Sequence, residues 1–502
     1  MIRALAVIWL MLFSVSCATY NNRIGSYYEQ VLNNQYEKAY ASLDKNKMLK
    51  RGRNRLLYLF EKGKLAHLLK QYDSSNQYFN EADLFIEDVR TSARDVVVGN
   101  LLNPMMETYK GEDFEKFMVH YYKALNYLNL GEPNEALVEA RRISLRSYAQ
   151  QDKSNNNTNR YSDDAFSLML QGIIYEQSND INNAFISYRN AADIFLKNKN
   201  LWYGVMMPAQ LKEDVLRTAA ANGFMDEVQR YEKLFNTTWQ KKPASEGGEL
   251  VLFWENGLAP VKTETNFFFT LTKDGLGNFT FVDATGLMNI PFDFSSNYNR
   301  DNIKLDELRS IRVAFPKYQE QPLYYRSATV SVNNEQYGFE EAENINNLAF
   351  ATLRERFLKE MGKTLTRLAI KKLAEAAARP KKDDKNKDEK EAMAAAIQIF
   401  NLLSEKADTR NWQSLPHTIM YTRIPLQPGV NVLQISLNGP NASEKPVNLV
   451  VEGNGGCAGV GCAGGISGGC AHIRGGGESC RYLYSLWAVC TSPRASHSIS
   501  FL

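Results

Sequence analysis

Residues Tyr109 to Ile143 read YKGEDFEKFMVHYYKALNYLNLGEPNEALVEARRI, and this stretch decides the fold of the region around it. Its apolar residues recur at helical spacing on both sides of a break at Gly131 and Pro133, which indicates two helices joined by a tight turn. With Phe117 opening the first helix, small residues fall where the two helices must touch. These residues are Ala124, Ala136 and Ala140. The stretch therefore predicts a compact helical hairpin.

A related hairpin is predicted from Ala165, in AFSLMLQGIIYEQSNDINNAFISYRNAADIF. Its small and aromatic positions are filled by Gly172, Tyr175, Ala184, Tyr188 and Ala191. The spacing is that of the tetratricopeptide (TPR) repeat, in which hairpins of about 34 residues stack because one alone cannot bury its apolar face. Tyr78 to Phe85 repeats the pattern of Tyr188 to Phe195 at a shift of 110 residues. We expect a TPR-like α-solenoid over residues 17–240, with an irregular helical bundle as the alternative.

The binding surface expected of such a stack is the concave face lined by the first helices of successive hairpins. That face draws on Lys116, His120, Lys123, Leu168, Gln171 and Tyr175. The carboxylates of the first hairpin are expected on its solvated surface: Glu112, Asp113, Glu115, Glu135 and Glu139. The expected partner is another protein, whose identity this pattern does not specify.

The first twenty residues, MIRALAVIWLMLFSVSCATY, predict a targeting signal. Arg3 precedes an apolar run over residues 4–13, and small residues then lead into Cys17. The segment resembles a bacterial lipoprotein signal over residues 1–16, which implies acyl chains on Cys17 and attachment to a membrane. No Asp follows the cysteine, which favours the outer membrane, facing the periplasm. Ser14 replaces the usual Leu, so an ordinary secretory signal or an uncleaved anchor remains as an alternative.

Composition limits the classes of function. The 59 basic and 56 acidic side chains nearly balance at a net charge of +3, so we expect no nucleic-acid partner. A chain of 502 residues accommodates two or three domains. Five of the six cysteines follow residue 456, and the sixth is Cys17. The body of the protein is therefore predicted to depend on its cores and not on disulfides.

The pattern changes from helical to alternating near Gly247. Aromatic and β-branched runs between Gly and Asp-Gly turns predict strands at 249–253, 265–272, 279–282, 311–315 and 325–332. A helical insertion is predicted at 342–378, a charged linker at 379–391, and further strands at 417–423 and 430–437. Residues 247–453 thus predict a β-rich, sandwich-like α+β domain with a helical insertion. The whole chain is predicted to be multidomain, α and then α+β.

Two segments carry a family-level resemblance: WENGLAPVK at 254–262 and ADTRNWQSLP at 407–416. With YKGEDFE and LVEARR, they resemble a family of uncharacterised bacterial TPR lipoproteins over most of residues 20–452. The resemblance implies no established activity. Some relatives are thought to be associated with envelope lipoproteins that regulate cell-wall synthesis, which makes cell-wall synthesis factors possible partners.

The side chains of these two segments allow two interpretations. In the first interpretation these side chains stabilise the core of the β-rich domain and its turn. In the second they form a ligand or partner patch. The residues concerned are Glu255, Asn256, Asp408, Arg410 and Trp412.

No catalytic or metal-binding motif is evident in the sequence. None of the five histidines forms an HExxH pair. Residues 465–469 fit GxSxG only formally, because a nucleophile elbow needs a strand before it and a helix after it. We expect a scaffold without cofactor or metal. The alternative is an enzyme, or a regulator of a peptidoglycan enzyme, with its site where ENGLAP meets ADTRNW.

Residues 454–502 form a tail rich in glycine and cysteine. The spacing of Cys457, Cys462, Cys470, Cys480 and Cys490 fits no CxxC pattern. We expect a disordered or aberrant segment, such as a frame-shifted end after Val451. A small disulfide or metal module is the alternative.

Overall fold

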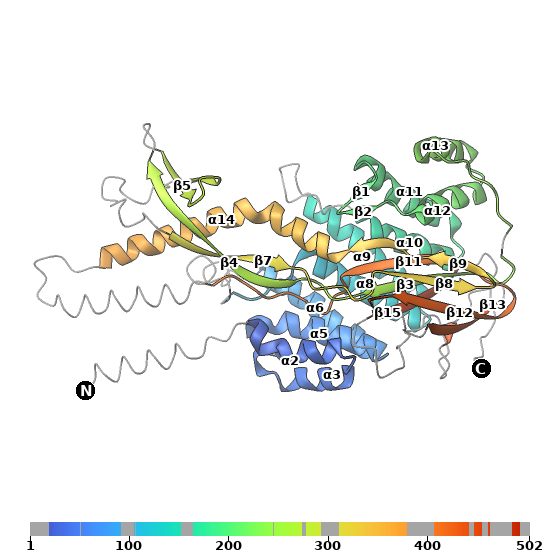
Figure 1. Ribbon diagram of the computed structural model, residues 1–502, viewed down its shortest axis with the longest axis horizontal. Coiled ribbons are helices and arrows are strands. Elements are labelled where there is room, and N and C mark those ends of the chain that lie inside the picture. Colours follow the sequence, from blue (N-terminus) through green and yellow to red (C-terminus); the bar gives the residue numbers. More distant parts are fainter. Residues whose placement is uncertain are drawn as a thin grey trace, which may run out of the picture.

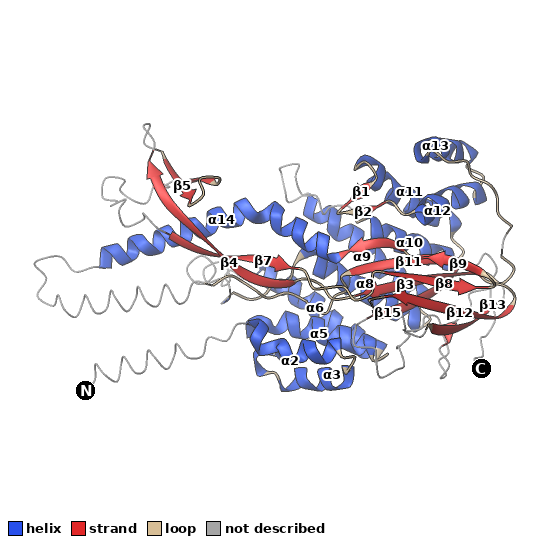
Figure 2. Cartoon of the chain, viewed as in Figure 1, coloured by secondary structure: helices blue, strands red, loops and turns tan. Residues whose placement is uncertain are grey.

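The computed structural model describes residues 20–50, 52–91, 105, 107–151, 164–243, 245–273, 278–292, 311–378, 406–440, 446–453, 460–461 and 484–491. Within these residues the protein mixes helices and sheets, which confirms the predicted α+β class (Figures 1 and 2). Cys17, the charged linker at 379–391 and the five tail cysteines except Cys490 lie outside the described residues.

Helices form the first half of the described chain. They are α2 (Tyr20–Leu32), α3 (Tyr36–Lys45), α4 (Lys47–Lys50), α5 (Arg55–Leu68), α6 (Tyr72–Thr91), α8 (Asp113–Asn129), α9 (Pro133–Gln151), α10 (Ala165–Gln177), α11 (Ile181–Lys197), α12 (Ala209–Ala221) and α13 (Met225–Phe235). A short hairpin of β1 (Leu201–Trp202) and β2 (Val205–Met206) separates α11 from α12. Consecutive helices pack in pairs, α5 on α6, α8 on α9 and α10 on α11.

Two of these pairs share one close contact. A Cβ added to Gly63 of α5 would overlap the ring of Phe79 in α6, and a Cβ added to Gly172 of α10 would overlap the ring of Tyr188 in α11. In each pair the ring follows the glycine by sixteen residues. The shift between structurally equivalent positions is thus 109 residues, one fewer than the shift of 110 at which the two sequences match. Because the glycines lack side chains, the two helices of each pair can approach closely.

Polar side chains fix where the central helices begin. Asp164 accepts a hydrogen bond from the Ser167 N–H (3.2 Å) at the start of α10, and Asp180 caps α11 in the same way. Helix α8 begins with a capping box between Glu112 and Glu115. Each device satisfies backbone N–H groups that have no partner within the helix.

The β-rich region contains three larger sheets. The first has the order β10 (Glu340–Asn344), β11 (Thr418–Pro425), β3 (Glu249–Asn256) and β15 (Tyr484–Thr491). The second has the order β14 (Val460–Gly461), β13 (Val447–Gly453), β12 (Gly429–Asn438), β8 (Ser327–Val332) and β9 (Glu335–Gly338). The third has the order β6 (Asn289–Phe292), β5 (Phe279–Asp283), β4 (Val261–Lys273) and β7 (Ile311–Gln319). All paired strands run antiparallel.

Alternation along β3 places its sheet between two apolar layers. Leu250, Leu252 and Trp254 belong to a core shared with the second sheet. Val251 and Phe253 belong to the larger core, which includes the helices. The first sheet therefore separates the helices from the second sheet, and side chains of opposite parity along β3 face these two layers.

The third sheet and the long helix α14 (Ile345–Ala378) extend to one side. Figure 1 shows α14, β4 and β5 pointing away from α12 and α13. Helix α14 contacts β6 and β7, and Phe357 of this helix packs edge-on against Phe315 of β7. The predicted helix at 342–378 is present from Ile345 to Ala378, and residues 342–344 belong instead to β10 (Glu340–Asn344).

The tail contributes two described strands, which differs from the expectation of a segment outside the fold. Val460–Gly461 pairs with β13, and Tyr484–Thr491 pairs with β3 along its full length. Within the described residues no helix combines the length and the hydrophobicity that a membrane crossing requires.

Candidate functional site: a buried seam between the helices and the sheets

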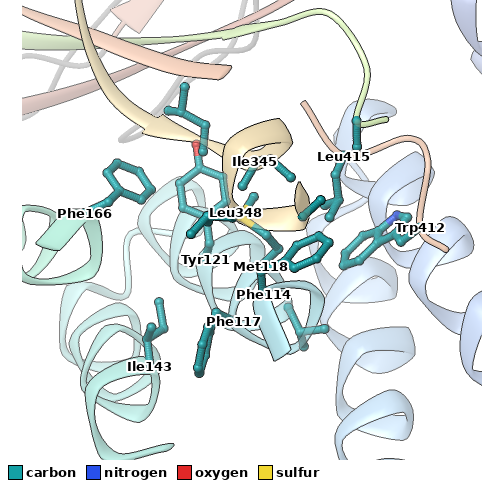
Figure 3. Close-up of a cluster of buried hydrophobic side chains, with 14 of the residues drawn as sticks. Phe114, Phe117, Met118, Tyr121, Ile143, Phe166, Ile345, Leu348, Trp412 and Leu415 are labelled. Atoms are coloured by element: carbon teal, nitrogen blue, oxygen red, sulfur yellow. The ribbon is translucent and has the colours of Figure 1, made fainter. Parts of the chain in front are cut away.

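The ADTRNW segment lies where α5, α8 and the start of α14 meet. Trp412 is fully buried, and its ring stacks on Phe60 with centroids 4.6 Å apart. Figure 3 shows Trp412 and Leu415 beside α8 residues including Phe114 and Met118. The indole N–H donates to Ser414 Oγ (2.9 Å), so the single polar atom of the ring is satisfied inside the core.

The boundary at which residues of the helices contact residues of the β-rich region is called the seam below. Arg410 has hydrogen-bond partners on both sides of it. Its guanidinium donates two hydrogen bonds to Asp408, at 2.7 and 2.6 Å, and one to Asn54 Oδ1 at 3.0 Å. Only 1% of its side chain is exposed, against 26% for Asp408. The pairing of Asp408 with Arg410, a possibility in the sequence, is present. The hydrogen bond from Arg410 to Asn54 anchors the loop to the residue that precedes α5.

The ENGLAP segment enters the same seam from β3. Glu255 Oε2 accepts hydrogen bonds from Lys64 Nζ at 2.9 Å and from the Tyr122 hydroxyl at 3.2 Å. Asn256 donates to the Tyr325 carbonyl at 2.8 Å. Glu255, Lys64 and Asn256 are all buried. Burial lowers the pKa of Lys64, although Glu255 acts in the opposite direction.

The start of α8 holds two carboxylates with opposite pKa shifts. Burial alone would raise the pKa of Glu112, but Lys262 (2.5 Å) and Arg356 (2.5 Å) outweigh it and lower this pKa to about 2. Burial and the neighbouring Glu112 raise the pKa of Glu115 to about 7. Separated pKa values of this kind are found in acid–base pairs of enzymes.

The Glu115 oxygens are nevertheless occupied by the protein itself. One accepts from the Trp412 N–H at 2.7 Å, and the other accepts from the Tyr109 hydroxyl at 2.6 Å and from the Glu112 N–H at 2.9 Å. Glu115 is fully buried. A general acid or base must reach a substrate proton, and this carboxylate instead binds a helix start to a loop. The geometry of Glu115 fits a structural role, in which it connects the start of α8 to the loop that contains Trp412.

Several residues expected on an open binding face are buried. His120 is fully buried, with Nδ1 2.7 Å from Glu139, and Lys123 lies 2.7 Å from the other oxygen of Glu139. The placement of His120 and Lys123 on an open binding face, and of Glu139 on the solvated surface, is therefore wrong, because the three groups pair with one another between α8 and α9. The burial of His120 fits the alternative that it is a packed histidine. Burial raises the pKa of Glu139. The hydrogen bond from His120 and the charge of Lys123 outweigh this effect and lower the pKa to about 2.

The other predicted face residues also have partners within the helices. Lys116 is partly exposed and pairs with Asp113 at 3.0 Å. Gln171 donates to the Ala140 carbonyl at 3.3 Å, and Tyr175 accepts from Arg141 at 2.8 Å. Leu168 is half-buried against the core. Glu112 and Glu115, expected on the surface, are buried in the seam.

A second cluster of charged side chains in the seam was not predicted from the sequence. Arg423 of β11 donates to Glu176 at 2.6 Å and to Glu249 at 2.7 Å, and lies 3.2 Å from Asp214. Arg217 pairs with the same Glu176 at 2.6 Å. One sequence feature could have indicated this cluster: the arginine within the apolar run TIMYTRIP. A charge within a buried strand requires partners of opposite charge. The sequence did not identify those partners, which come from α10, α12 and β3.

In the described part of the chain no group of three or more His, Cys, Asp or Glu side chains could hold a metal ion. No protein-family model, curated protein or solved structure matches this chain.

Proposed function

We propose that the protein is a lipid-anchored envelope scaffold in which TPR-like hairpins, joined to a β-rich region, hold another envelope protein. In this proposal acyl chains on Cys17 attach the mature protein to the outer membrane, facing the periplasm. The protein acts by binding, with no reaction of its own. Its partner supplies or receives the activity.

Helix packing supports the TPR-like part of the proposal. Gly63 with Phe79 and Gly172 with Tyr188 have the same spacing and the same contact. The intervening pair of helices has Ala124 and Ala140 at the same spacing, and both are fully buried. Recurrence of buried small residues at one spacing through successive hairpins is typical of a helical repeat array.

The observation that carries the proposal is the use of both sequence motifs as internal connectors. Glu255 binds Lys64 of α5, and Trp412 binds Glu115 of α8, so residues of ENGLAP and ADTRNW contact helices instead of surrounding an accessible substrate site. A scaffold requires that the surfaces of its helical and β-rich regions keep a fixed position relative to each other. Buried ion pairs suit that role because breaking one leaves an uncompensated charge.

We place the partner contact on the β1–β2 hairpin. Leu201 and Met206 face each other across this hairpin and are 52% and 72% exposed. Positive φ at Lys199, Asn200 and Tyr203 holds the hairpin in a conformation that non-glycine residues seldom adopt. A fixed, exposed apolar pair suits an apolar segment of a partner protein.

The test combines cross-linking on intact cells with two matched substitutions. Met206→Asp should reduce the cross-linked adduct strongly. Leu287→Asp, at a residue 86% exposed between β5 and β6, should leave it unchanged. Equal adducts from the two variants would place the partner elsewhere.

The anchor is tested separately. Cys17→Ser should move the protein from the membrane pellet to the soluble periplasmic fraction. Retention in the pellet after a carbonate wash would contradict lipid anchoring through Cys17.

A further inference from the structure

Strand β3 has the environment of a central strand. Each residue from Leu250 to Trp254 is at most 1% exposed, and none of them is charged. Its two faces contribute to two different cores. Backbone N–H and C=O groups of such a strand are shielded from water, so they need a hydrogen-bonded neighbour along both edges.

One neighbour of β3 comes from within the β-rich region and the other from the tail. β11 pairs with β3 from Thr418 opposite Asn256 to Pro425 opposite Glu249. β15 pairs with the opposite edge over the same residues, from Tyr484 opposite Asn256 to Thr491 opposite Glu249. Helix α10 also contacts β15. The tail strand thus covers the whole length of the edge that β11 leaves open.

The far edge of the same sheet has a different character. β10 reads EEAEN and is a short, acidic strand. Short strands with charged side chains are a common protection of a true sheet edge. β3 carries no such protection between Leu250 and Trp254. The sequence of β3 therefore fits a position that another strand must cover.

The covering segment has a matching composition. β15 reads YSLWAVCT, which is uncharged and rich in aromatic and β-branched residues. It is separated from β14 by residues 462–483, a glycine-rich stretch in sequence. Pairing through main-chain hydrogen bonds is how extended peptides add to open sheet edges.

We propose that the β3 edge opposite β11 is a strand-accepting binding site, and that its occupant is the segment 484–491 of this chain. The site takes an extended, uncharged segment in antiparallel register. It is independent of the proposed scaffold function. A peptide with the sequence of residues 484–491 should bind the site whenever the chain's own strand is prevented from pairing.

The test uses the full chain with Leu486→Pro and Trp487→Pro together. Adjacent residues of a strand point their N–H groups to opposite edges, so two consecutive prolines remove one donor toward β3 whatever the register. The matched control places prolines at Gly475 and Gly476, between β14 and β15 in the sequence. The probe is a fluorescent peptide of residues 484–491 with Ser in place of Cys490.

The double-proline variant should bind the peptide saturably at one site, and the wild-type and control chains should bind it at least roughly tenfold more weakly, a difference of about 1.4 kcal/mol. Amide hydrogen exchange in β3 should accelerate in the variant and slow again when the peptide is added. If the variant keeps its fold, yet β3 exchange is unchanged and no peptide binds, the proposal is wrong. Equal binding by all three chains would also overturn it, because the site would not be the one that β15 fills.

Discussion

Trp412 donates its backbone N–H to a Glu115 carboxylate oxygen 2.7 Å away, and so closes the first turn of α8 with a residue from the loop before β11. The ring of the same tryptophan stacks on Phe60 of α5. One residue thus joins two helices from different hairpins to the β-rich region.

Replacing Trp412 by Ala should destabilise the protein by about 3–5 kcal/mol, because a large buried ring is lost and its cavity is not refilled. Urea unfolding followed by circular dichroism measures the change. The half-buried Trp239 is the matched control, and its replacement by Ala should cost clearly less. Equal losses at the two sites would show that the seam contact has no special weight.

Replacing Gly172 by Ala should cost about 1–3 kcal/mol, since the new methyl group would overlap the Tyr188 ring and separate α10 from α11. The control is Gly25→Ala in α2, where nothing lies within 4 Å of the added carbon. There Ala should stabilise the helix by up to about 1 kcal/mol. Thermal unfolding distinguishes them, and a neutral Gly172→Ala would contradict the close helix contact.

Replacing Lys64 by Met should cost about 3–5 kcal/mol, because it leaves the Glu255 carboxylate buried without its cation. Adding Glu255→Gln should restore much of this loss, since the unpaired charge is then removed. A double-mutant cycle on the free energy of unfolding measures the coupling. Additive losses would mean that the two groups act independently.

His67, whose pKa burial lowers to about 3, should raise the free energy of unfolding as the pH rises from about 4 to about 6.5. Over the same window the titration of Glu115 should lower it. The Glu115 pKa of about 7 in the folded state exceeds the value of about 4.3 in the unfolded chain, so the folded state binds more protons in this window. The loss is of the order of 3 kcal/mol when the window has been crossed. Glu112, whose folded pKa is about 2, acts oppositely, and its stabilisation is lost only as the pH falls below about 4.

The Glu115→Gln variant isolates this effect, because its side chain does not titrate. In urea unfolding at a series of pH values, the wild type should lose more stability, or gain less, than the variant between pH 4 and 7, because only the wild type carries the Glu115 titration. Some pH dependence should remain in the variant, since burial also raises the pKa of Asp164 to about 6. The same pH dependence in both chains would contradict the raised pKa of Glu115.

Local features of this fold followed from the sequence. Ala136, Ala184 and Tyr188 are buried at helix contacts, as their spacing predicted, because neighbouring helices of a hairpin follow directly from periodicity. The strands at 249–253 and 430–437 also correspond to β3 and β12. The change from helices to sheets near Gly247 was predicted for the same reason, since local period distinguishes the two.

The two segments of the candidate site were identified from the sequence, but the helix residues that contact them were not. Glu115 lies in a run of charged residues that suits a solvated surface, and it becomes buried because Trp412, nearly three hundred residues later, closes over it. His120 and Lys123 were placed on an open face because the first helices of stacked hairpins line such a face, but in the structure both pair with Glu139. Pairing between charges distant in sequence leaves no periodic signal, whereas apolar burial does.

The most direct test of the account measures amide hydrogen exchange by mass spectrometry in the Trp412→Ala variant. If the buried seam couples the helices to the sheets, α8 (Asp113–Asn129) and β3 (Glu249–Asn256) should both exchange faster than in the wild type, by similar factors. Acceleration confined to residues 406–417, with α8 and β3 as protected as before, would contradict a coupling role for the seam.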